Sequence, residues 1–228
     1  MTTTTLHPAG ASGKVRLNKI LLTGGILSSL FYVGINVFVP MLYEGYHSAS
    51  QTVSELSAIG APTRSLWILL VSVYSVLTLA FGWGVMRVSA HNRYLHWVGL
   101  LIIAYTIFGL FWPPMHQRET LAAGGGSLTD TLHIAWTVIT IPLWLLIMGL
   151  AARLFGRRFQ IYTVATIVIQ LSFGVLTGLQ SADMEANLPT PWMGVWERIS
   201  IAAYMVWVIV FAIKLLQNEK APESKLSL

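Results

Sequence analysis

Residues 20–42 read ILLTGGILSSLFYVGINVFVPML and contain no Asp, Glu, Lys or Arg. A helix of about 20 apolar residues crosses the hydrocarbon core of a bilayer, so this stretch is long enough to span a membrane. It follows Lys14, Arg16 and Lys19, a charge order that resembles a signal peptide. The apolar region of a signal peptide is only about 7–15 residues long, so we expect a retained first transmembrane helix.

Five more apolar stretches follow, and none of the six alternates polar and apolar residues as a barrel strand would. Unpaired backbone amides cost several kcal/mol each in hydrocarbon, which forces helix on such stretches. The sequence therefore predicts an all-α integral membrane bundle of six transmembrane helices in residues 18–216. The tails are 1–17 and 217–228, and the expected spans cover about 18–42, 65–86, 94–112, 132–150, 159–180 and 195–216.

The composition agrees with a membrane protein and excludes several other classes. Of the 228 residues, 55% are hydrophobic and 10% are charged, whereas soluble domains carry about 25% charged residues. The basic residues form no stripe, so the pI near 9.6 predicts no nucleic-acid partner. The chain has no cysteine, which excludes disulfides, Cys-ligated metals and a Cys nucleophile.

The basic residues also predict the orientation of the helices. Eleven of the 14 Lys and Arg residues lie in or next to the two tails and the connectors near 87–93 and 151–158, with Lys19 and Lys214 just inside the adjoining spans. Seven of the nine acidic residues lie with Arg64, Arg118 and Arg198 in or next to the other three connectors. The positive-inside pattern predicts a protein of the cytoplasmic (inner) membrane with both termini in the cytoplasm.

The three external connectors are long and contain most of the reactive side chains. In the first, Thr52 and Glu55 match a capping box, which predicts a short helix there. Asp130 and His133 lie one helical turn apart, and a carboxylate beside an imidazole is a candidate acid–base pair for catalysis. Equally, Asp130 could simply cap the start of its helix.

Other polar residues on this side are candidates for binding a ligand. Arg118 or Arg198 could hold an anionic group such as phosphate or carboxylate. For Glu197 and Arg198, a buried ion pair that fixes the register of the helices is the alternative. The candidate ligand-binding residues are Glu55, His116, Arg118, Glu197 and Arg198.

A metal site is a secondary alternative, and no cofactor is identified. His47, His116 and His133 could supply three imidazoles to a divalent metal, a ligand set typical of catalytic zinc. The three histidines lie in separate segments without the short spacing of known zinc motifs.

Four segments resemble a known family. These are residues 50–64 (SQTVSELSAIGAPTR), 113–118 (PPMHQR), 130–133 (DTLH) and 196–198 (WER). Together they are similar to the bacterial and archaeal family named domain of unknown function 998, over residues 21–216. The resemblance implies a six-helix integral membrane protein of unassigned activity.

We therefore expect a bilayer-embedded protein that binds or processes a small or lipid-like ligand in a polar cavity open to the extracytoplasmic side. A small-solute transporter is one alternative, and would need a span broken near mid-membrane, for which Pro142 is the prominent candidate. A structural or assembly protein is the other. Oligomeric state and ligand identity are not indicated by the sequence.

Overall fold

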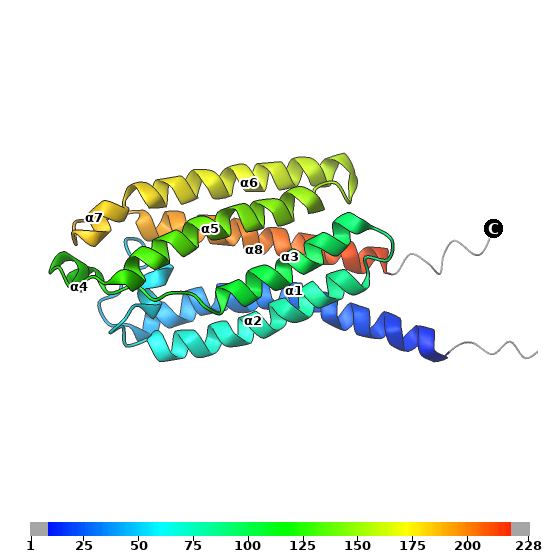
Figure 1. Cartoon of the computed structure of the whole chain (residues 1–228), viewed down its shortest axis with the longest axis horizontal. Helices are drawn as coiled ribbons and strands as arrows, with labels where there is room; N and C mark the ends of the chain where they lie inside the picture. Colours follow the sequence, from blue (N-terminus) through cyan, green and yellow to red (C-terminus); the bar gives the residue numbers. More distant parts are fainter. Residues whose placement is uncertain (1–8, 220–228) are drawn as a thin grey trace, which may run out of the picture.

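The computed structural model describes residues 9–219, with side chains from residue 13, and this part of the chain is helical without strands (Figure 1). The long helices are α1 (Ala9–Phe38), α2 (Arg64–Arg87), α3 (Arg93–Gly109), α5 (Leu128–Ala151), α6 (Gly156–Leu179) and α8 (Met193–Asn218). The short ones are η1 (Val39–Leu42), η2 (Val53–Ser57), α4 (Arg118–Ala122) and α7 (Ser181–Glu185).

Five of the long helices, all except α3, are long and apolar enough to cross a membrane. This confirms the all-helical, membrane-type fold, with α1 starting at Ala9 inside the predicted N-terminal tail. The third span was expected at 94–112, but α3 has 17 residues and ends at Gly109. A glycine favours a helix end, and Pro113 and Pro114 cannot continue one. The chain therefore runs from α3 to α4 as a non-helical segment.

The long helices form a ring around a shared core. α2 packs against both α1 and α3, α5 packs on α3, α8 packs on α1, and α6 packs on α8. Packing of α5 on α6 is sparse, and packing across the ring is sparser still. The circular order is therefore α1, α2, α3, α5, α6 and α8, with its loosest seam between α5 and α6.

Small residues allow α1, α2 and α3 to approach closely. A Cβ atom added at Gly84 of α2 would lie 2.8 Å from the Leu21 Cβ of α1. One added at Gly99 of α3 would lie 2.7 Å from the Met86 backbone nitrogen of α2. Such contacts are typical of helix packing in lipid, where dispersion between backbones replaces the hydrophobic effect.

The two ends of the ring differ. The described ends of α1 and α8 nearest the termini lie at one end, where the core is filled by the fully buried side chains of Phe81, Trp207 and Phe211. At the other end, the three long connectors gather with η2, α4 and α7 (Figure 1). We call these connectors, residues 39–63, 110–127 and 180–192, the connector cap.

Candidate functional site

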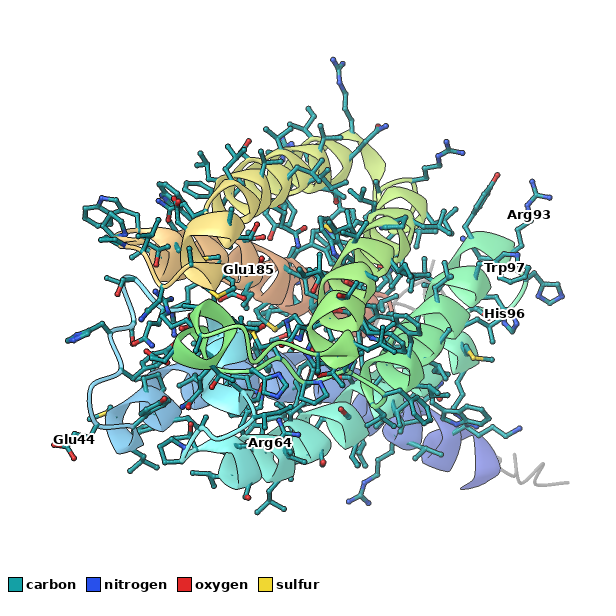
Figure 2. All side chains as sticks on the ribbon, turned by 60° about the vertical axis from the view of Figure 1, so that its left-hand side comes forward. Glu44, Arg64, Arg93, His96, Trp97 and Glu185 are labelled. Carbon is teal, nitrogen blue, oxygen red and sulfur yellow. The ribbon has the colours of Figure 1, made fainter. Side chains whose placement is uncertain are left out.

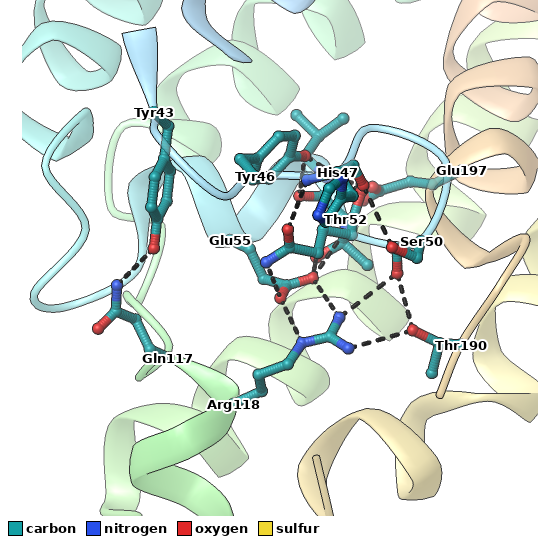
Figure 3. A network of polar contacts seen from close by, with 12 residues as sticks. Tyr43, Tyr46, His47, Ser50, Thr52, Glu55, Gln117, Arg118, Thr190 and Glu197 are labelled. Atoms are coloured by element: carbon teal, nitrogen blue, oxygen red, sulfur yellow. Dashed lines mark hydrogen bonds and ion pairs between the residues drawn. The ribbon is translucent and has the colours of Figure 1, made fainter. Parts of the chain in front are cut away.

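The centre of the connector cap is an ion pair between Glu55 and Arg118. The predicted capping box is confirmed, because Thr52 and Glu55 close the first turn of η2 reciprocally. The Glu55 carboxylate therefore points inward, and only 3% of the surface of this residue is exposed. Arg118 opens α4, is 8% exposed and meets this carboxylate with two parallel bonds (Figure 3). Its Nε donates to Oε1 at 2.7 Å and its Nη2 to Oε2 at 2.9 Å.

The same guanidinium joins all three connectors. Its Nη1 donates to the Thr190 hydroxyl at 3.2 Å, and its Nη2 also reaches the Ser50 carbonyl at 3.4 Å (Figure 3). Thr190 in turn donates to the Ser50 carbonyl at 2.7 Å. Nothing in the sequence singled out Thr190, since a lone threonine in a proline-containing loop has no distinctive pattern. One buried cation therefore fixes the relative positions of three loops.

The Glu55 carboxylate accepts further bonds from its own connector. The Thr52 backbone N–H donates to Oε2 at 2.6 Å and the Thr52 hydroxyl donates to it at 3.0 Å. The Gln51 side-chain amide donates to Oε1 at 3.3 Å. With the two bonds from Arg118, both oxygens are well supplied with donors. Glu55 and Arg118 therefore stabilise the cap and offer little to a ligand.

Glu197 and Arg198 of α8 hold the first connector from the other side. Glu197 accepts the backbone N–H of Val53, the first residue of η2. Arg198 donates through Nη1 to the carbonyls of Ser48 at 2.7 Å and Gln51 at 3.0 Å. The two side chains do not form an ion pair with each other within the described residues. They hold the loop by separate contacts.

Tyr46 completes the attachment of this loop. The Nη2 of Arg198 donates to its hydroxyl at 2.6 Å, and the hydroxyl donates to the Thr52 carbonyl at 2.7 Å. Burial raises the pKa of Tyr46 well above its usual range, so the phenol stays protonated and keeps this donor.

The structure pairs Asp130 with His116 and not with His133. Asp130 Oδ2 lies 2.9 Å from His116 Nδ1, and Asp130 Oδ1 accepts the His116 backbone N–H at 2.7 Å. The Ser127 backbone N–H also donates to Asp130 at 2.8 Å, which closes a capping box at the start of α5. The carboxylate is thus turned back over its own helix end, away from the next turn where His133 lies.

His133 has a different partner. Its Nδ1 lies 2.8 Å from the Pro113 carbonyl, and its ring meets Trp112 edge to face with centroids 4.8 Å apart. The backbone carbonyls after Gly109 have no next helical turn to bond, so a donor from α5 satisfies one of them. His133 therefore stabilises the non-helical segment after α3.

An open cleft of about 420 Å³ lies beside this group. Asp130 and Glu185 are its charged members, and Figure 2 shows Glu185 on α7 at the same end of the molecule. The cleft is bounded by the glycine-rich turn before α5, by the first two turns of α5 and by α7. Its lining residues are Leu121, Gly124, Gly126, Ser127, Leu128, Asp130, Thr131, Ile134 and Glu185.

The described residues contain no group of three or more His, Cys, Asp or Glu side chains placed to share a metal ion. His116 faces Asp130 and His133 faces Pro113, while His47 lies on the exposed surface of the first connector. The three histidines of the alternative metal site are therefore not gathered around one point.

Comparison of the sequence with models of known protein families identifies the family of this chain. The model described as "Protein of unknown function (DUF998)" matches residues 26–214. The chain belongs to the DUF998 family. The matched region includes every cap residue described above and agrees with the resemblance drawn from the four sequence segments. No curated protein and no solved structure matches this DUF998 chain significantly.

Proposed function

We propose that this DUF998 protein spans the cytoplasmic membrane six times, with both termini in the cytoplasm and the connector cap outside. α3 is apolar, and its 17 residues meet the lower limit of about 17 for a span. The exposed apolar residues Leu110, Phe111 and Trp112 extend its apolar surface. The basic connectors near Arg87 and Arg157 lie at the end of the ring where the described part of α1 begins and that of α8 ends, as expected from the positive-inside pattern.

In this orientation the cleft beside Asp130 binds a small or lipid-like molecule that arrives from the outer side. If the protein is an enzyme, the same cleft is where that molecule reacts. One observation supports this most strongly: the carboxylate that borders the cleft also orients His116 at 2.9 Å. Bonding at Nδ1 leaves Nε2 of the imidazole as the atom for proton transfer or ligand binding. The acid–base pair of this proposal is therefore Asp130 and His116, with His133 as a structural residue.

Replacing His116 with asparagine tests the cleft. The asparagine amide can still donate to Asp130, but the Nε2 atom is removed. Native mass spectrometry of the gently purified protein should detect a bound molecule in the wild type, and its occupancy should fall about tenfold or more in His116→Asn. His47→Asn changes an exposed histidine that does not line the cleft, and this variant should retain wild-type occupancy. Equal occupancy in the His116 and His47 variants would contradict the proposal.

A structural or assembly role is the second candidate. It is favoured because the charged side chains of the cap already use their hydrogen-bonding atoms within the chain. Glu55, Arg118 and Arg198 direct their polar atoms at other parts of the same chain. In that case the wild-type protein carries no bound molecule, and His116→Asn changes neither ligand content nor stability. Transport receives less support, because α5 is uninterrupted through Pro142.

A further inference from the structure

The charged side chains in and beside the cleft are acidic, with one exception. Asp130 and Glu185 are the charged residues of the lining. The short helices α4 and α7 pack against each other beside the cleft and add Glu119 and Asp183, both of them exposed. The one cation of these two helices is Arg118, which is buried in the ion pair at the centre of the connector cap. The opening of the cleft therefore lies in a negative electrostatic field.

An anionic ligand would find no counter-charge in this cleft, because its lining contains no Lys or Arg. The arginines that could hold an anionic group, Arg118 and Arg198, are engaged elsewhere. Arg118 bonds the Glu55 carboxylate, and Arg198 bonds the carbonyls of Ser48 and Gln51. The charges around the cleft therefore favour a cation as its ligand.

The charged groups of the lining accept hydrogen bonds. Asp130 Oδ2 already takes bonds from His116 Nδ1 and from the Ser127 N–H, whereas Oδ1 accepts only the His116 N–H. A carboxylate oxygen can accept about two bonds, so Oδ1 keeps one position. Glu185 is exposed, and its carboxylate belongs to no ion pair within the described residues. A protonated amine has three N–H donors and no acceptor, so it complements these groups.

The rest of the lining suits an organic molecule better than a bare metal ion. Leu121, Leu128 and Ile134 supply apolar surface beside the two carboxylates. No group of three or more His, Cys, Asp or Glu side chains in the described part of the chain is placed to share a metal ion. The volume of about 420 Å³ falls within the range of small-molecule sites.

We propose that the ligand of this cleft is an amphipathic organic cation, a protonated amine with an apolar body. This inference rests on the function proposed above and adds the chemical class of the ligand. The ammonium group binds at Asp130 and Glu185, and the apolar body packs against Leu121, Leu128 and Ile134. Because Glu185 is exposed, salt screens its attraction for the ammonium group, and the affinity falls as ionic strength rises.

The test measures binding of phenethylamine, which is protonated at neutral pH, to the full chain in phosphatidylcholine nanodiscs by NMR titration. The wild type should show one saturable site that empty nanodiscs lack. Glu185→Gln removes one exposed charge and should weaken binding about two- to fivefold. Glu185→Lys adds a repelling charge and should weaken it at least about tenfold.

Glu44→Gln is the matched control. Glu44 is also an exposed carboxylate, but it lies on the first connector, well away from Glu185 (Figure 2). This variant should bind phenethylamine as the wild type does. Phenylpropionate, an anion of similar size, should show no saturable binding to any of the four proteins.

Equal affinity for phenethylamine in the wild type and in Glu185→Lys would overturn the proposal, because the amine would then bind elsewhere. Saturable binding of phenylpropionate at least as tight as that of the amine would overturn the ligand class. If His116→Asn weakened that binding, the cleft itself would stand. Absence of saturable binding by either probe would also refute the inference, while the mass-spectrometric comparison of His116→Asn with His47→Asn would still decide whether the cleft binds a molecule.

Discussion

Replacing Arg118 with methionine is expected to lower the free energy of unfolding by about 3–5 kcal/mol. The substitution leaves the Glu55 carboxylate buried at 3% exposure without the cation that now binds it at 2.7 and 2.9 Å. It also removes the bonds to Thr190 and Ser50, so all three connectors lose a common anchor. Reversible unfolding in mixed micelles, followed by circular dichroism, measures the loss.

A second variant separates the ion pair from simple loss of packing. In Glu55→Met with Arg118→Met both charges are absent, so no buried charge is left unpaired and much of the stability should return. Arg64→Met is the matched control for removing an arginine, because within the described residues the Arg64 side chain hydrogen-bonds only the Ser57 carbonyl, and Arg64 is less buried. A loss below about 1 kcal/mol for Arg118→Met, or strictly additive losses in the double variant, would contradict this account.

Gly194→Ala is expected to destabilise the protein by about 1–3 kcal/mol through overpacking. The first turn of α8 lies directly against the first connector, where Val195 N–H donates to the Ala49 carbonyl at 3.1 Å. A Cβ atom on Gly194 would collide with the carbonyl oxygens of Ser48 and Gln51 and would lie 2.8 Å from Arg198 Nη1. The collision separates the same groups that Arg198 holds together.

Gly149→Ala is the matched control, since its Cβ would meet nothing within 4 Å in the last turn of α5. That variant should be neutral or more stable by about 0.5–1 kcal/mol, because alanine favours helix. Both variants can be compared by thermal unfolding in the same detergent. Equal melting temperatures for the two would show that α8 and the first connector are not in contact as described.

Much of the fold could be predicted because it depends on local properties of the chain. Apolar length determines where helices form, and five of the six expected spans are helices long enough to cross a membrane. The capping box at Thr52 and Glu55 was also predictable, since it involves residues three apart. The end of α3 was placed too late because hydropathy continues through Trp112 while helical structure stops at Gly109.

The candidate site was predicted as a set of residues but not as a set of partners. Asp130 was expected to bond His133, three residues away, yet it bonds His116 from the preceding connector. Arg118 and Glu55 are 63 residues apart, and no local pattern encodes such a pair. Partner choice depends on which buried donors and acceptors remain unsatisfied after the helices have packed, and that is a property of the whole fold.

The account depends on the first connector packing against the start of α8 on the outer face of the membrane, and cross-linking tests this most directly. The chain has no cysteine, so Ala49→Cys and Val195→Cys introduce a clean pair across the first connector and α8. Asn18→Cys and Arg87→Cys form the matched pair at the other end, where Arg87 Nε donates to Asn18 at 3.0 Å. A membrane-impermeant bismaleimide should link the first pair only in right-side-out vesicles and the second only in inside-out vesicles. The reverse pattern, or no link at positions 49 and 195 in either preparation, would contradict the account.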